Sequence, residues 1–249
     1  MLEVCIDAVA SARAATAGGA DRVELCANLP EGGTTPSAGM IQSVRGAFAG
    51  GLMVLIRPRG YDFLYAEQEV QAMLHDIRVA HELGADGVVI GCLTPDGRVD
   101  ARRCEQLMSA TKSMDVTFHR AFDMTRHLGE ALEDVIGLGI KRILTSGGQP
   151  DAWLGTSVIA DLVRQSAGRA VIMPGGGVTE VNLSQIVQST GAREIHLSAR
   201  DAVRSSMLYR NEHCSMGAFS KEHEFEWREA SAEKIRFARK ALTDTLARR

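Results

Sequence analysis

The sequence predicts an α/β fold, a single-domain (β/α)8 barrel of the TIM type over residues 1–249. Apolar runs of strand length alternate with segments of helical periodicity, which is typical of right-handed βαβ units around a parallel sheet. The length of 249 residues suits one such barrel, whose usual size is about 250 residues. An open dinucleotide-binding sheet would need a glycine fingerprint directly after its first strand, whereas Gly18 and Gly19 follow the first predicted helix.

We expect eight strands, at residues 2–7, 21–27, 52–57, 87–92, 115–120, 141–146, 170–174 and 194–198. The helices predicted between and after them include residues 8–17, 66–83, 101–112, 180–189 and 231–247. Gly84, Gly139 and Gly191 stand where helices should stop, so each is expected in the left-handed conformation. Ser37 is placed to cap the second helix.

The connection between the eighth strand and the last helix, residues 201–228, is unusually long and polar. Loops of such length are usually functional or mobile. We expect residues 207–211 to cover the barrel mouth and residues 221–224 to form a solvated turn. His213 and Cys214 are metal-like residue types, but a solvent loop that happens to contain them is the simpler interpretation.

Charge and composition narrow the classes of partner. A net charge of -3 and the absence of a long basic run give no reason to expect nucleic acid. No window approaches the roughly 20 apolar residues that cross a bilayer, so we expect a cytoplasmic protein without a membrane partner. Five cysteines in a chain with ample core predict reduced thiols rather than a disulfide framework. Small molecules or ions are the expected partners, and no organic cofactor is expected.

Two short stretches share one pattern, Glu3-Val4-Cys5 and Glu24-Leu25-Cys26. Because side chains alternate along a strand, the carboxylate and the thiol of each stretch lie on the same face. If the two strands are neighbours, two thiols and two carboxylates converge inside the barrel.

Alternation also sorts the remaining strand residues, since the outward set should be apolar and meet the helices. The outward set is Val4, Val23, Leu25, Ile56, Val116, Phe118, Ile143, Ile195 and Leu197. The inward set is Glu3, Cys5, Glu24, Cys26, Arg57, Thr117, His119, Ser146, His196 and Ser198. So polar an interior predicts a site, because buried charges cost several kcal/mol unless they are paired. The alternative is a set of structural ion pairs, for instance Glu24 with Arg57.

Several of these residues suit catalysis at the carboxyl ends of the strands, where active sites of this fold lie. Arg57 can clamp a carboxylate or phosphate, Glu24 or His119 can move a proton, and Asp123 follows the same strand as His119. A lyase, aldolase or isomerase acting on a small phosphorylated or carboxylated metabolite fits this set. The absence of an inward lysine argues against a Schiff-base aldolase.

Glycine-rich turns follow the sixth and seventh strands, where free backbone N–H groups attract anions. The candidate residues for an anion site are Ser146, Gly147, Gly175, Gly176 and Ser198.

Five segments, at residues 21–26, 31–37, 56–60, 117–123 and 209–211, resemble the CutC family, which is named for copper homeostasis. The similarity extends over nearly the whole chain. The resemblance implies a TIM-like barrel in the cytoplasm, a homo-oligomer with a dimer favoured, and handling of Cu(I). Carried over to this chain, the family's proposed copper-binding thiols are Cys5 and Cys26, whereas Cys92, Cys104 and Cys214 match no motif position.

Three interpretations remain open. Cys5 and Cys26 could bind Cu(I), which thiolates prefer over hard cations, with a nitrogen from His119 or His196. The same pocket could belong to an enzyme. The barrel could also be a scaffold whose interior is filled by salt bridges. Structural zinc is less expected, because no paired Cys-x-x-Cys spacing occurs.

Overall fold

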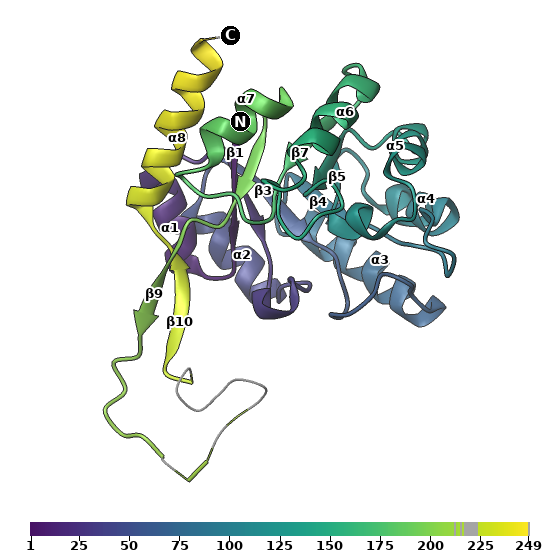
Figure 1. Cartoon of the computed structure of the whole chain (residues 1–249). Coiled ribbons are helices and arrows are strands. Elements are labelled where there is room, and N and C mark those ends of the chain that lie inside the picture. Colours follow the sequence, from purple (N-terminus) through teal and green to yellow (C-terminus); the bar gives the residue numbers. More distant parts are fainter. Residues whose placement is uncertain (212, 215, 217–223, 249) are drawn as a thin grey trace.

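Eight parallel strands form the wall of a barrel in the computed structural model, which describes residues 1–211, 213–214, 216 and 224–248. Neighbouring strands pair in the order β7-β6-β5-β4-β3-β2-β1-β8, and β8 returns beside β7, so the barrel is nearly closed (Figure 1). The strands are β1 (Leu2–Ile6), β2 (Arg22–Leu25), β3 (Gly51–Leu55), β4 (Gly87–Ile90), β5 (Asp115–Phe118), β6 (Arg142–Thr145), β7 (Val171–Pro174) and β8 (Ile195–Leu197). The predicted TIM-type fold is confirmed.

Helices surround this wall and connect successive strands (Figure 1). They are α1 (Val9–Gly18), α2 (Ala38–Ala47), α3 (Glu67–Glu82), α4 (Ala101–Ala110), α5 (Leu128–Gly137), α6 (Thr156–Ser166), α7 (Leu183–Thr190) and α8 (Ala232–Ala247), with short 3₁₀ turns η1 (Leu29–Glu31) and η2 (Arg120–Met124). Gly84, Gly139 and Gly191 have φ of 82°, 80° and 80°, as predicted. The Ser37 hydroxyl accepts from the Met40 N–H and caps α2.

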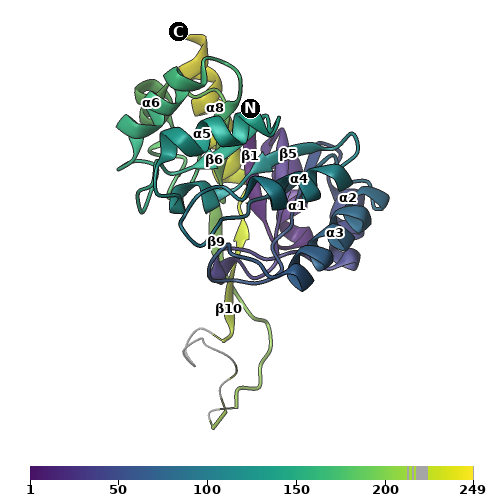
Figure 2. The same ribbon diagram turned by 90° about the vertical axis from the view of Figure 1, so that its right-hand side faces the viewer.

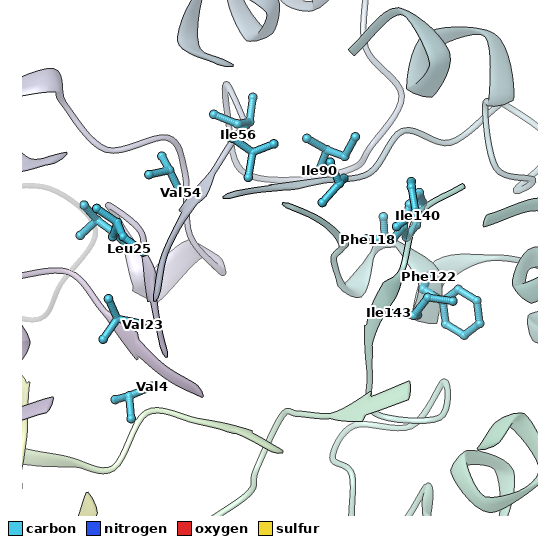
Figure 3. Close-up of a cluster of buried hydrophobic side chains, with 14 of the residues drawn as sticks. Val4, Val23, Leu25, Val54, Ile56, Ile90, Phe118, Phe122, Ile140 and Ile143 are labelled. Carbon is cyan, nitrogen blue, oxygen red and sulfur yellow. The ribbon is translucent and has the colours of Figure 1, made fainter. Parts of the chain in front are cut away.

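The apolar core lies between the strands and the helices. The outward-facing strand residues are buried in this layer, and Figure 3 shows Val4, Val23, Leu25, Ile56 and Ile143 pointing from the strands toward the surrounding helices. A second, smaller apolar group, Cys5, Cys26, Met53, Leu55 and Val89, lies inside the barrel. The alternation expected from the sequence therefore separates two buried regions. The layer between strands and helices is apolar, whereas inside the barrel thiols and charged groups mix with aliphatic side chains.

The connection before α8 is not the simple loop predicted from its polar sequence. It contains two antiparallel strands, β9 (Arg200–Arg204) and β10 (Glu226–Ala230), which project as an arm away from the barrel (Figures 1 and 2). The prediction that residues 207–211 cover the barrel mouth is wrong, since this ladder directs them outward and leaves Leu208 97% exposed. His213 and Cys214 are also exposed in the arm. Residues 221–223 of the predicted turn lie outside the described residues, and Glu224 lies in a turn before β10.

Candidate metal and ligand site

Cys5, Glu24 and Cys26 meet inside the barrel because β1 and β2 are parallel neighbours. Their register places Cys5 directly opposite Glu24. The two sulfur atoms lie 3.8 Å apart, and one ligand atom from each of the three side chains lies within 4.8 Å of the others. All three side chains are buried. The predicted convergence is therefore present for both thiols and for Glu24, whereas the second carboxylate, Glu3, pairs with Arg22 and His196 instead.

The two thiols differ in protonation. A hydrogen bond from the Cys26 thiol lowers the pKa of Cys5 to about 5, and a hydrogen bond from His196 adds to this effect against the opposing effect of burial. The same sulfur–sulfur hydrogen bond, together with burial and the charge on Cys5, raises the pKa of Cys26 well above its ordinary value. At neutral pH the pair consists of one thiolate and one thiol that donates to it.

His196 is the cation of this site. Glu3 stands opposite His196 in the β1–β8 register, and its Oε1 lies 2.7 Å from the imidazole Nδ1. Burial would lower the pKa of His196, but hydrogen bonds to Cys5 and Glu3 outweigh it and raise that pKa well above its ordinary value. The sequence placed His196 inward only as an optional metal ligand, whereas the structure makes it the ring that joins Glu3 to the thiol pair.

Glu24 carries a proton at neutral pH. Burial and the charge of the Cys5 thiolate raise the pKa of this carboxyl to about 8, even though His196 opposes the shift. Its Oε2 lies 3.6 Å from Nε2 of His196. The suggested structural pair of Glu24 with Arg57 does not form; the nearest charged partner of Glu24 is this imidazole.

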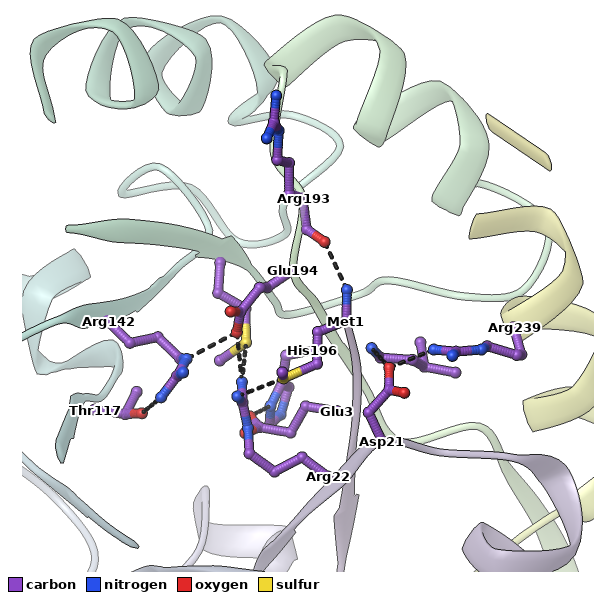
Figure 4. A network of polar contacts seen from close by, with 12 residues as sticks. Met1, Glu3, Asp21, Arg22, Thr117, Arg142, Arg193, Glu194, His196 and Arg239 are labelled. Atoms are coloured by element: carbon purple, nitrogen blue, oxygen red, sulfur yellow. Dashed lines mark hydrogen bonds and ion pairs between the residues drawn. The ribbon is translucent and has the colours of Figure 1, made fainter. Parts of the chain in front are cut away.

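An ion network fills the amino-terminal half of the barrel below the site. Arg22 pairs with Glu3 and, at 2.8 Å, with Glu194, which in turn pairs with Arg142 at 2.8 Å (Figure 4). Arg142 also donates to the Thr117 hydroxyl. The salt-bridge interpretation therefore holds for this lower half. Sequence reasoning missed Arg22 and Glu194, although each stands two positions before an inward residue and could have been found by continuing the alternation.

Above the ions lies a cavity of about 120 Å³. Its polar wall contains both thiols, Glu24, His196, His119 and two arginines, and its apolar wall is made by Leu29, Leu55, Phe63 and Leu144. A barrel filled throughout by salt bridges would leave no such space. The interpretation of the barrel as a scaffold whose interior is filled by salt bridges therefore does not describe the carboxyl end of this barrel.

His119 lines that cavity as a neutral ring. Its Nδ1 accepts a hydrogen bond from the Ala121 N–H at 3.2 Å, and burial together with the charge of Arg57 lowers its pKa to about 3. Since Nδ1 is the acceptor, the ring proton is on Nε2, which is buried and has no partner among the described residues. Gly91 leaves the space for this ring, because a Cβ there would lie 2.5 Å from the imidazole.

Arg57 holds a loop rather than presenting an open fork. Its Nη1 donates to the carbonyl oxygens of Glu31 and Gly33, and its Nη2 donates to that of Tyr61. The guanidinium also lies over the ring of Phe63, 4.9 Å from its centroid. Arg57 was predicted to clamp a carboxylate or phosphate with two parallel hydrogen bonds. Instead, both terminal nitrogens already donate to backbone carbonyls, so Arg57 contributes positive charge to the cavity wall but cannot form that bidentate contact.

Asp123 organises the loop after β6 and does not line the cavity. Its carboxylate accepts from the N–H groups of Ser146 and Gly148 and from the guanidinium of Arg120. The Gly147 N–H donates to the Thr145 hydroxyl. Ser146 and Gly147 therefore have no free N–H for an external anion, contrary to the prediction, because an internal carboxylate already occupies that turn.

The remaining candidates for an anion site are spread around the rim. Gly175 lies against Leu144 and His196, and its N–H donates to the Thr145 carbonyl. Gly176 has φ of 90°, and a Cβ there would lie 3.0 Å from Nη1 of Arg120. Ser198 is half-buried and outside the cavity lining. The five predicted residues do not form one site, but Gly176 makes room for an arginine that reaches the cavity.

The spacing of the sulfur pair, recorded as a thiol–thiol hydrogen bond, also falls within the range for two ligands of one soft metal ion. With metal–sulfur bonds of about 2.3 Å, as in zinc thiolates, two sulfurs on one ion lie roughly 3.8 Å apart at a tetrahedral angle and about 4.6 Å apart in a linear arrangement. The observed 3.8 Å falls at the short end of this range. A bound ion would replace the shared proton, because coordination deprotonates a thiol. Cys5 and Cys26 would hold it, with Glu24 beside them.

The fold and this site together define a TIM-barrel protein with a buried thiol pair at the carboxyl end of its strands. The sequence model of the CutC family matches residues 1–201, and the chain belongs to that family. A CutC family protein of Bacteroides thetaiotaomicron is 50% identical over 94% of each chain. The human copper homeostasis protein cutC homolog is 47% identical over 95% of this chain and 86% of its own length.

Solved structures agree with this assignment. The structure of CutC from Streptococcus agalactiae superposes with a TM-score of 0.77 at 35% identity, covering 80% of this chain and 98% of that one. A thiamine phosphate pyrophosphorylase from Pyrococcus furiosus superposes with a TM-score of 0.61 at 15% identity, over 98% of this chain and 96% of that one. The second likeness shows the barrel fold alone.

Proposed function

We propose that this chain binds Cu(I) as cargo through Cys5 and Cys26, as a copper homeostasis protein. The observation that carries the proposal is the buried sulfur pair at 3.8 Å, and the lowered pKa of Cys5 adds to it because a metal ligand must be a thiolate. Thiolates select Cu(I) over hard cations, and the relatives named for copper homeostasis point the same way. The reduced thiols and the resemblance support a cytoplasmic location. In the described part of the chain, no helix has both the length and the apolar character to cross a membrane.

Anaerobic competition with a chromogenic Cu(I) chelator tests the proposal. The intact chain is expected to take one equivalent of Cu(I), and the double variant Cys5→Ser, Cys26→Ser should lose at least about a hundredfold in affinity. Cys92→Ser, Cys104→Ser is the matched control, because those buried thiols lie in the outer apolar layer. Undiminished affinity in the first double variant would remove Cys5 and Cys26 from the site.

We further propose that the chain forms a homodimer through the arm. Exposed large apolar side chains gather in the loops that follow the strands and in the arm: Tyr61, Met124, Leu154, Val181, Leu208 and Tyr209. An isolated two-stranded ribbon is only marginally stable in water, so the arm needs a partner surface. A cavity of about 890 Å³ at the arm's base, beside Phe225 and Trp227, offers a second arm an apolar seat.

Light scattering on the eluted protein tests the dimer. The intact chain should have the mass of two chains, and Leu208→Asp, Tyr209→Asp should have the mass of one. Phe237→Asp, on the exposed face of α8, is the control and should stay dimeric. A monomeric intact chain, or a dimeric arm variant, would contradict this proposal.

Catalysis on a small phosphorylated or carboxylated metabolite is a second candidate function. It is favoured by Glu24, a buried carboxyl that holds its proton to about pH 8 and faces the cavity beside the imidazolium of His196. Such a pair can exchange a proton with a bound substrate, as a lyase or isomerase requires. Deuterium exchange into candidate metabolites tests it: the intact chain should catalyse exchange, and Glu24→Gln should abolish it. If none of the small organic acids tested takes up deuterium in the presence of the intact chain, this second function is contradicted.

A further inference from the structure

The cavity contains a hydrogen-bond donor for which the fold supplies no acceptor. His119 is 5% exposed, and the hydrogen bond from Ala121 to Nδ1 fixes its proton on Nε2. Nε2 has no partner among the described residues. A buried N–H without an acceptor is destabilising, so an unpartnered donor in a side chain that lines a cavity points to a ligand.

Arg120 also lines the cavity and carries a second free donor. Its Nε is bound by Asp123 and its Nη2 by Ser146, which fixes the plane of the guanidinium. No hydrogen bond of Nη1 is found in the part of the chain that the structure describes. Gly176, without a side chain, allows this nitrogen to lie over its Cα. The guanidinium is therefore pre-oriented with one N–H edge unused.

The charge and shape of the cavity define what these donors would bind. Arg57 brings a permanent positive charge that no carboxylate pairs with among the described residues, because its terminal nitrogens donate to backbone carbonyls, so the cavity favours an anion. The opposite wall is apolar and consists of Leu29, Leu55, Phe63 and Leu144. An inorganic anion would leave that wall without a contact, whereas the hydrocarbon part of an organic acid would cover it.

We propose that this cavity binds the anion of a small carboxylic acid, whose carboxylate accepts hydrogen bonds from Nε2 of His119 and Nη1 of Arg120. The ligand is small because the cavity measures about 120 Å³, below the roughly 300 Å³ at which pockets for drug-sized ligands begin. The inference does not rest on copper binding, because neither donor belongs to the thiol cluster.

Calorimetric titration of the metal-free, reduced full chain with sodium pyruvate tests the proposal, with sodium chloride at matched ionic strength as the blank. We expect saturable binding by the intact chain and about ten- to a hundredfold weaker binding by His119→Phe, which keeps the ring but removes the donor. His127→Phe is the matched control, because His127 is exposed before α5 and does not line the cavity. Equal binding by His119→Phe and the intact chain would overturn the proposal, and so would inorganic phosphate that binds more tightly than pyruvate.

A ¹⁵N spectrum of the histidine rings gives a second readout that needs no variant. In the intact chain the proton of His119 should be on Nε2, and its resonance should shift on addition of pyruvate. A proton on Nδ1, or an Nε2 resonance that pyruvate leaves unchanged, would contradict the proposal. The titration uses the metal-free chain, so an absence of copper binding leaves its outcome unchanged, and a failure of this inference is distinguishable from a failure of the copper proposal.

Discussion

The imidazole of His196 lies 2.7 Å from the carboxylate of Glu3, a residue 193 positions earlier in the chain. Glu3 is 1% exposed and also pairs with Arg22, so one buried anion holds two cations. This contact joins the ion network of the lower barrel to the thiol pair above it. The candidate site therefore depends on residues that do not line its cavity.

Replacing Glu3 by Gln should destabilise the fold strongly. The substitution leaves Arg22 and His196 without their shared carboxylate, and breaking a buried pair costs about 3–5 kcal/mol. Urea unfolding measures the loss. Glu133→Gln, which breaks a surface pair with Arg169, is the control and should leave stability nearly unchanged. Similar losses of stability in both variants would show that the buried ion pairs of Glu3 stabilise the fold no more than the surface pair of Glu133 does.

Glu3 should also contribute to acid sensitivity. Its pKa in the folded chain is lowered to about 2, because hydrogen bonds and charge from His196 and Arg22 outweigh the opposing effect of burial, while an unfolded glutamate titrates near 4.5. The stability from this group is present above about pH 4.5 and is lost as the pH falls toward 2. Stability curves of the intact chain and Glu3→Gln should therefore converge over this window. Parallel curves would contradict the lowered pKa.

The Cys5 thiolate should react with iodoacetamide at a rate that changes little between pH 6.5 and 8.5, because its pKa of about 5 leaves it ionised throughout. The rate of an ordinary thiol, with a pKa of about 8.5, would rise roughly fiftyfold over the same interval. Cys26→Ala removes the hydrogen bond from Cys26, so the pKa of Cys5 should rise and the rate should become pH-dependent. Mass spectrometry of the labelled peptides measures both rates. A pH-dependent rate in the intact chain would refute the assigned thiolate.

His119 should make the fold less stable in mild acid. Its pKa is lowered to about 3 in the folded chain, and an unfolded histidine has a pKa near 6.5. Between these values the unfolded state binds the extra proton, so stability falls as the pH drops, by up to about 1.4 kcal/mol per unit. The slope between pH 6.5 and 4 should be smaller in His119→Phe, as measured by urea unfolding at each pH. An unchanged slope would mean that His119 is protonated in the fold.

Asp123→Asn should loosen the turn after β6. The carboxylate accepts from two backbone N–H groups and from the Thr145 and Ser146 hydroxyls, and an amide cannot replace all of these bonds. Hydrogen exchange at Ser146 and Gly148 should accelerate at least tenfold. Asp134→Asn, at an exposed position on α5, is the control and should leave these two amides protected. Retained protection in Asp123→Asn would assign the turn's rigidity to its glycines.

Local pattern alone determined most of the architecture. Period-two alternation placed Val4 and Leu25 outside and Cys5 and Glu24 inside, and helix-ending glycines such as Gly139 located the helix ends. These features depend on neighbours within a few positions, which is why sequence reasoning reached them. The arm was missed because β9 and β10 are polar strands that pair across a long connection, and polar strands lack the apolar signal by which strands are recognised.

The roles of the inward residues were decided only by the tertiary structure. The sequence predicted Arg57, Asp123 and Ser146 as ligand-binding groups. In the structure Arg57 donates to backbone carbonyls, and Asp123 accepts from backbone N–H groups. The Ser146 hydroxyl forms hydrogen bonds with Asp123 and Arg120. Which polar group is satisfied internally depends on partners far away in the chain, and alternation carries no information about them. The repeated Glu-x-Cys pattern did establish that two thiols share the barrel interior. The lowered pKa of the Cys5 thiol and the unpartnered N–H of His119 are different in kind. Both depend on contacts that form only when all eight strands close around the same axis.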